Sequence, residues 1–64
     1  MDTVLLAERV AGIDPRLRVE WVGGRCVLHG PASLPVPVEV AALRVVEQEA
    51  QAFEWRAHVD MGDV

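Results

Sequence analysis

The chain has 64 residues, of which 52% are apolar, and a sequence of this length is expected to form one domain, residues 1–64. Its 10 acidic and 6 basic residues give a net charge of -4, which opposes binding to nucleic acids and to anionic lipid surfaces. A single cysteine excludes a disulfide within the chain, so we expect this small domain to gain stability from a partner subunit.

The first predicted element is a short helix near the N-terminus. Its apolar residues recur at helical spacing: Leu6, Ala7, Val10 and Ala11. Asp2 or Thr3 is suited to cap the start of this helix, and Gly12 is suited to end it. Pro15 disfavours helical geometry at the residue before it, so a loop is expected to follow.

An antiparallel hairpin is predicted over residues 17–30, where apolar and polar residues alternate on both sides of Gly23 and Gly24. A Gly-Gly pair tolerates the positive φ angles of a two-residue type I′ turn, and that turn pairs Val22 with Arg25. Cross-strand partners share a face. One face is then apolar: Leu17, Val19, Trp21, Cys26 and Leu28. The opposite face is mixed: Arg18, Glu20, Val22, Arg25, Val27 and His29.

Residues 31–53 predict a proline-rich start, for which Ser33 is a suitable cap, and then a long second helix. One apolar stripe comprises Val36, Val40, Leu43, Val46, Ala50 and Phe53. A second stripe beside it comprises Val38, Ala41, Val45 and Ala52. The polar face is limited to Arg44, Glu47, Gln48 and Gln51. A helix that is apolar around more than half of its girth predicts contact with another chain.

Alternation returns in residues 54–61 and predicts a third strand. Its inward residues are Trp55, Ala57, Val59 and Met61, and its outward residues are Glu54, Arg56, His58 and Asp60. The order of elements predicts an α+β fold, an αββαβ two-layer sandwich whose three-stranded sheet carries both helices on one face. The third strand can lie beside the first or beside the second, and the sequence favours neither place.

The stretch DPRLRVEWVGGRCVLHG, residues 14–30, resembles the BON domain, a small αββαβ module. The family's strand end V-x-L-x-G is matched by Leu28 and Gly30, with Cys26 in place of the valine. The resemblance covers nearly the whole chain and implies the same fold. It also implies binding of membrane lipid, the envelope role associated with the family. Other αββαβ modules, including those that build rings and multimers in secretion systems, fit almost as well.

Residues able to support chemistry are few. His29 and His58 fall on the outer sheet face near three carboxylates, but their spacing matches no metal motif, so we expect neither a metal nor a cofactor. Cys26 is predicted to pack in the core as a small apolar residue. Ser33 and Thr3 lack the setting of a catalytic nucleophile, so an enzyme is the least favoured interpretation.

The predicted function is that of a non-enzymatic protein-interaction module. It would self-associate, with a dimer the first expectation, through apolar helix surface: Val38, Ala41 and Val45. The outer sheet face is a second predicted surface, for a protein partner: Arg18, Val22, Arg25, Val27, His29, Arg56 and His58. The alternative is a BON-like lipid or small-ligand binding module that uses the apolar surface as a groove. With neither a signal peptide nor a membrane-spanning stretch of roughly 20 apolar residues, a cytoplasmic location is expected.

Overall fold

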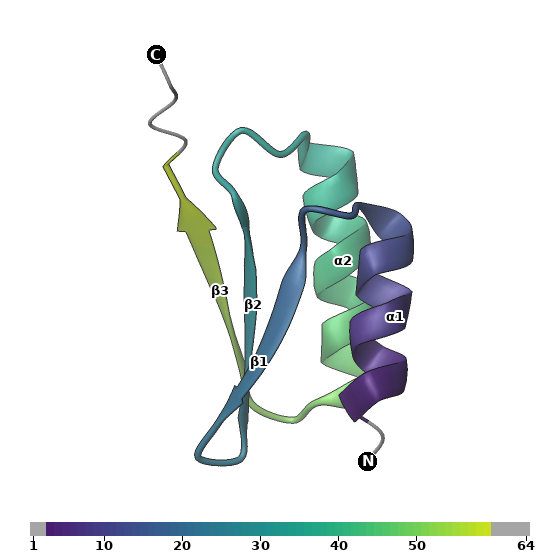
Figure 1. Cartoon of the computed structure of the whole chain (residues 1–64), viewed down its shortest axis with the longest axis vertical. Helices are drawn as coiled ribbons and strands as arrows, with labels where there is room; N and C mark the ends of the chain where they lie inside the picture. The colour runs from purple at the N-terminus through teal and green to yellow at the C-terminus, as the bar shows by residue number, and fades with distance from the viewer. Residues whose placement is uncertain (1–2, 60–64) are drawn as a thin grey trace.

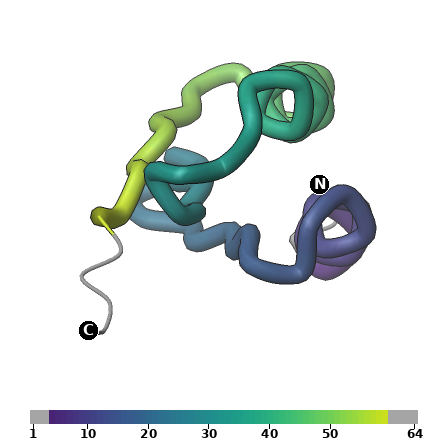
Figure 2. The backbone as a smooth tube through the Cα atoms, turned by 90° about the horizontal axis from the view of Figure 1, so that it is seen from above, coloured from purple at the N-terminus to yellow at the C-terminus, as the bar shows by residue number. Residues whose placement is uncertain are grey.

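In the computed structural model the structure is described for residues 3–59, and its elements follow the predicted αββαβ order (Figure 1). They are α1 (Thr3–Ile13), β1 (Arg18–Val22), β2 (Arg25–Pro31), α2 (Val36–Glu49) and β3 (Phe53–His58). The three strands form one layer and the two helices lie side by side against one face of it (Figure 2). The predicted two-layer α+β fold is therefore confirmed.

The hairpin of β1 and β2 has the predicted turn and register. Gly23 and Gly24 have φ angles of 57° and 79°, the left-handed region that glycine adopts without a steric penalty. Val22 pairs with Arg25, and the antiparallel pairing continues outward to Arg18 and His29. The turn thereby decides which side chains face the helices and which face outward.

The third strand lies beside β2, which settles the position that the sequence left open. The strand order is β1-β2-β3, and β3 runs parallel to β2, with Cys26 paired to Phe53 and Leu28 paired to Trp55. Parallel strands need a long crossover connection, and the segment that contains α2 supplies it. This arrangement makes β2 the central strand and leaves β1 and β3 as the two edges of the sheet.

Helix α2 is shorter than predicted at both ends. Ser33 does not cap it; the helix begins after Pro35, whose carbonyl accepts hydrogen bonds from the backbone N–H groups of Val38 and Glu39. At the other end Ala50 is already extended, with φ -132° and ψ 134°. The predicted continuation to Phe53 is wrong because residues from Phe53 onward pair with β2, and tertiary strand pairing overrides local helix propensity.

The core lies between the sheet and the helices. Its buried residues are Leu6, Val10, Leu17, Cys26, Leu28, Leu34, Ala42, Val46 and Ala50, and both tryptophans pack partly buried against them. Ala42 was not among the predicted apolar positions. Val59, predicted to face inward, is 73% exposed because it lies beyond the end of β3, whereas Asp60 and Met61 fall outside the described residues. Burial raises the pKa of the Cys26 thiol, as expected for a structural cysteine.

The two helices run in opposite directions beside each other (Figure 1). The guanidinium of Arg9 on α1 forms an ion pair with the Glu49 carboxylate on α2, with 2.8 Å between Nη1 and Oε2. This pair links the second half of α1 to the end of α2, although exposed ion pairs of this kind contribute little to stability. Neither helix in residues 3–59 is long and apolar enough to span a membrane.

Candidate functional site

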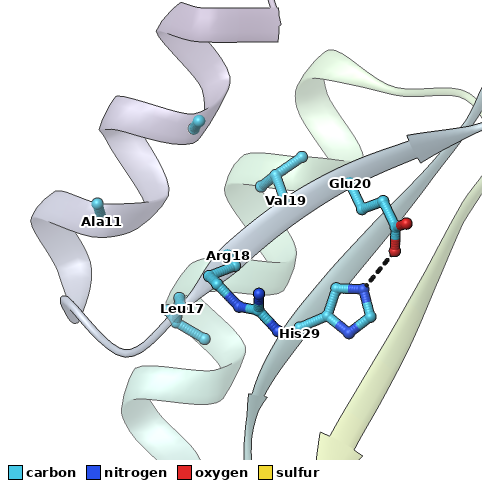
Figure 3. Close-up of a pocket in the computed structure, with 7 residues that line it drawn as sticks. Ala11, Leu17, Arg18, Val19, Glu20 and His29 are labelled. Carbon is cyan, nitrogen blue, oxygen red and sulfur yellow. Dashed lines mark hydrogen bonds and ion pairs between the residues drawn. The ribbon is translucent and has the colours of Figure 1, made fainter.

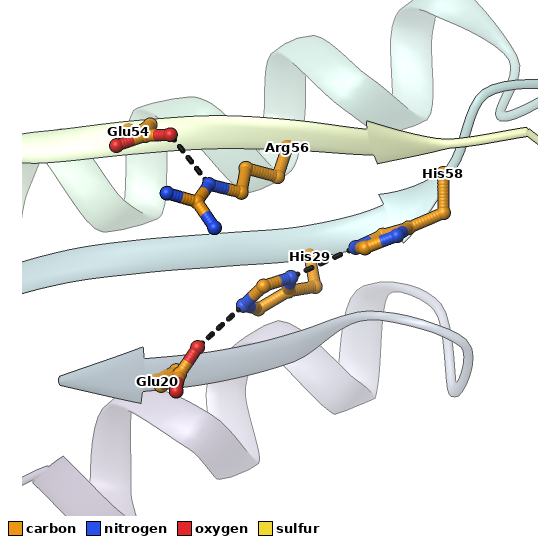
Figure 4. Close-up of polar contacts among 5 residues, drawn as sticks. All are labelled: Glu20, His29, Glu54, Arg56 and His58. Atoms are coloured by element: carbon orange, nitrogen blue, oxygen red, sulfur yellow. Dashed lines mark hydrogen bonds and ion pairs between the residues drawn. The ribbon is translucent and has the colours of Figure 1, made fainter. Parts of the chain in front are cut away.

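A chain of hydrogen bonds crosses all three strands on the face of the sheet that the helices leave open (Figure 4). His29 on the central strand lies between Glu20 of β1 and His58 of β3. Its Nε2 is 2.9 Å from Oε1 of Glu20, and its Nδ1 is 2.8 Å from Nε2 of His58. The two imidazole rings are stacked, with centroids 5.1 Å apart and planes inclined by 26°.

When both imidazole rings are neutral, only one assignment of donors and acceptors fits these two hydrogen bonds. A carboxylate only accepts hydrogen bonds, so Nε2 of His29 is the donor to Glu20. Nδ1 of a neutral His29 is then an acceptor, and the N–H of His58 Nε2 donates to it. This leaves Nδ1 of His58 as the ring nitrogen that the chain does not use.

The predicted partner surface on this face is partly covered. Val27 and His29 are only 3% and 9% exposed, so these two side chains form the floor of the face. Val22 is 53% exposed, and the other predicted residues of the surface are exposed as well: Arg18, Arg25, Arg56 and His58. A partner docking here would therefore meet mainly guanidinium and imidazole groups.

An ion pair lies along the β3 edge of the same face, where the Arg56 guanidinium contacts the Glu54 carboxylate (Figure 4). The hydrogen bond from Arg56 is the main cause that holds the pKa of Glu54 below its usual value of 4.5, and the charge of Arg25 acts in the same direction. Glu54 in turn raises the pKa of Arg56.

Replacing Arg56 by glutamine should raise the pKa of Glu54 back toward 4.5, whereas Arg25→Gln should raise it less because Arg25 acts by charge alone. A carboxyl group with a lowered folded-state pKa stabilises the fold above its unfolded pKa, and that contribution disappears as pH falls through the folded pKa. A carbon-13 NMR titration of the Glu54 carboxyl group measures its pKa in each of the two variants. An unchanged Glu54 pKa in Arg56→Gln would contradict the assigned cause.

A hollow of about 310 Å³ lies at the end of the sheet where β2 and β3 finish. We call it the cationic hollow, and its lining comprises Arg16, Arg18, His29, Gly30, Pro31, His58 and Val59. The Asp14 carboxylate accepts hydrogen bonds from Nε and Nη2 of Arg16, at 3.1 and 3.0 Å, and this contact lowers the pKa of Asp14. The guanidinium of Arg18 has no hydrogen bond or ion pair to any residue in the described range 3–59.

A larger groove of about 690 Å³ lies between α1 and the open edge of β1 (Figure 3). Its walls are small and apolar on the helix side, at Ala7 and Ala11, and mixed on the strand side, at Leu17, Arg18, Val19 and Glu20. His29 lines this groove as well as the cationic hollow. This is the place in the described structure where the predicted small-ligand alternative would find a groove.

The predicted self-association stripe on α2 is divided between core and surface. Val38 and Val45 are partly buried and pack against the core, while Ala41 is exposed. Val45 lies one turn before Glu49, which pairs with α1, so this flank of α2 is turned toward the other helix. The most exposed apolar side chains of α2 are Val36 and Val40, at 69% and 41%.

A metal site finds no support among residues 3–59, where no group of three histidine, cysteine or carboxylate side chains is arranged to hold an ion. Both nitrogens of His29 are engaged, one by Glu20 and the other by His58. A metal would therefore have to displace at least one of these hydrogen bonds to use that imidazole.

No protein-family model, no curated protein and no solved structure matches the chain. The resemblance to BON domains, which is carried by residues 14–30 and by the order of the elements, stays a prediction. Function has to be argued from the surfaces themselves, because the same fold supports many functions.

Proposed function

We propose that this chain is a non-enzymatic interaction module that self-associates through the first half of α2. The observation that carries the proposal is an exposed apolar surface on the first two turns of that helix, beside the partly buried Glu39. This surface, the α2 patch, comprises Val36, Pro37, Val40 and Ala41, all of which are exposed. Exposed apolar side chains at i and i+4 of a helix lie one above the other and form a continuous strip.

A second copy of the same chain fits this patch best. A twofold contact places the same patch on both subunits, so an uncharged patch meets an uncharged patch without like charges opposed. The chain carries a net charge of -4, and two copies therefore approach at the lowest electrostatic cost where the surface has no charge. Burial of the valines is the proposed driving force, at roughly 25 cal/mol per Å² of apolar surface.

The variant Val36→Glu with Val40→Glu tests the proposal. Two charges on the α2 patch should weaken association by at least about tenfold, because the contact would bury unpaired carboxylates. The matched control, Gln48→Glu with Gln51→Glu, adds the same charge at exposed polar positions and should associate like the original chain. Analytical ultracentrifugation measures both, and equal dissociation constants for the two variants would refute the patch as the interface.

Charges at Val38 and Val45 test the predicted stripe less clearly. Both side chains pack against the core, so Val38→Glu with Val45→Glu is expected to unfold the chain whether or not the stripe is an interface. The α2 patch shares Ala41 with the predicted stripe and moves the contact to the outward side of the helix.

A small-ligand or lipid binding module is the second candidate, and the groove between α1 and β1 is the observation that favours it. Such a module would stay monomeric, and an apolar fluorescent dye would bind it at that groove. Charged residues in the groove wall, such as Ala11→Glu, would then abolish dye binding without changing the mass in solution. A cytoplasmic location is part of the proposal, and the free thiol of Cys26 suits a reducing compartment.

A further inference from the structure

We infer that the cationic hollow binds a small oxyanion of the phosphate or sulfate kind. The inference is independent of self-association, because the α2 patch is on the helix layer and the hollow is on the sheet and its preceding loop. Its volume of about 310 Å³ is at the lower end of the range of about 300–1,000 Å³ for small-molecule sites. A ligand of a few atoms therefore suits it.

The charges around the hollow point to an anion. The chain has more acidic than basic residues, yet none of the residues in the range 3–59 that line the hollow is a carboxylate. Two acids of the described range that are close to these residues already have partners, since Asp14 accepts hydrogen bonds from Arg16 and Glu20 accepts one from His29. The guanidinium of Arg18 has none within the described part of the chain, and a planar guanidinium offers parallel N–H donors that match two oxygens of an oxyanion.

The hydrogen-bond chain makes His58 the second recognition group (Figure 4). If His58 takes up a proton, it does so at Nδ1, becomes a cation and gains an N–H donor, while its bond to His29 is kept. A proton on His29 as well would set two N–H groups against each other across the 2.8 Å contact. The pair therefore keeps its contact with only one added proton, and anion binding favours that proton on His58.

Several charged or titratable groups surround His58 and His29 on this face: Arg16, Arg18 and Glu20 on the β1 side, and Arg25, Glu54 and Arg56 on the β2 and β3 strands. The carboxylate of Glu54 is paired with Arg56 and that of Glu20 with His29, and neither lines the hollow. An anion of constant charge should therefore bind more tightly to the form of the protein in which His58 carries the added proton.

Nitrogen-15 NMR titration of the full chain with sodium sulfate, at ionic strength held constant with sodium chloride, tests the inference. We expect saturable shifts at Gly30 and its neighbours. Arg18→Gln should bind sulfate about tenfold more weakly, since a hydrogen bond to a charged group is lost. Arg25→Gln is the matched control, because Arg25 is also exposed on the open face but lies at the opposite, hairpin end of the strands. Equal binding by the two variants would overturn the site.

Measuring sulfate affinity at two pH values distinguishes a specific role of His58 from general attraction by positive charge. Sulfate keeps the same charge between about pH 5.5 and about pH 8, so any change in affinity comes from the protein. The original chain should bind about tenfold more tightly at the lower pH, and His58→Gln should remove most of that dependence. A pH dependence that is absent from the original chain, or retained in His58→Gln, would overturn the role of His58.

A ligand arm distinguishes the sources of the oxyanion. Inorganic phosphate and glycerol phosphate present the same oxygens, and tighter binding of the ester would assign the hollow to a phosphorylated small molecule, whereas tighter binding of inorganic phosphate would assign it to the free ion. Acetate at equal concentration is the contrasting probe, because a carboxylate offers only two oxygens. Binding of acetate as tight as that of sulfate and phosphate would overturn the assignment to the phosphate class.

Discussion

Leu28→Ala is expected to remove most of the protein's free energy of unfolding. Leu28 is fully buried at the middle of the central strand, between Val19 of β1 and Trp55 of β3. Leucine-to-alanine changes at such sites lower the free energy of unfolding by about 2–5 kcal/mol, through lost burial and the cavity left behind. A domain of this size rarely has more than about 3–5 kcal/mol in total, so the loss is comparable with the whole.

Urea unfolding followed by tryptophan fluorescence measures this loss, because Trp21 and Trp55 both pack against the core. The comparison is made at one protein concentration, since association adds to apparent stability. Val22→Ala is the control on the same sheet, where the side chain is 53% exposed and the expected loss is within about 0.5 kcal/mol. An equal loss for both variants would contradict the position of Leu28 at the centre of the core.

Gly30→Ala should be the most destabilising single-methyl change in the sheet. An added Cβ would lie 2.6 Å from Cδ2 of Leu17 and 2.8 Å from Cη2 of Trp55. Leu17 is 3% exposed and the indole ring is rigid, so neither neighbour can move aside without disturbing the core. Overpacking of this kind lowers the free energy of unfolding by about 1–3 kcal/mol.

Gly12→Ala makes the same chemical change with the opposite expected sign. Gly12 is near the end of α1, and an added Cβ there meets no atom within 4 Å. Alanine is favoured over glycine in a helix by up to about 1 kcal/mol, so this variant should be as stable as the original chain or more stable. Thermal unfolding of the two variants side by side gives the comparison, and a Gly30→Ala protein no less stable than Gly12→Ala would refute the close packing at Gly30.

The hairpin could be predicted because its determinants are local. The Gly-Gly turn fixes the pairing of Val22 with Arg25, and every further pair follows by counting. The end of α2 could not be predicted in the same way, because Ala50, Gln51 and Ala52 are acceptable in a helix. Their extended path is decided by the pairing of β3 with β2, a contact between segments that are far apart in the sequence.

The sequence predicted which face of the sheet carries the residues of the candidate site, but not the contacts between their side chains. Alternation placed His29 and His58 on the outer face, yet their hydrogen bond depends on β3 lying parallel beside β2, which the sequence left open. The burial of Val27 and His29 on that face could not be predicted either. Alternation indicates which face of the sheet a side chain is on, but not whether neighbouring side chains shield it from solvent. Arg16 was missed as a lining residue, although its spacing of two from Arg18 was a usable signal.

Exposure on α2 shows the same limit of periodicity. The sequence marks two apolar stripes on one helix and does not say which of them the rest of the fold covers. The antiparallel placement of α1 decides this, since it covers the flank that carries Val45 and Glu49 and leaves Val36 and Val40 outside. The surface proposed for association thus consists of the apolar residues of α2 that packing within the chain leaves exposed.

The measurement that tests self-association most directly is the mass of the purified chain in solution, by light scattering during size-exclusion chromatography. We expect a mass twice the 7.0 kDa of one chain, falling toward 7.0 kDa in Val36→Glu with Val40→Glu. A mass of 7.0 kDa at the highest concentration at which the protein stays dissolved would contradict self-association.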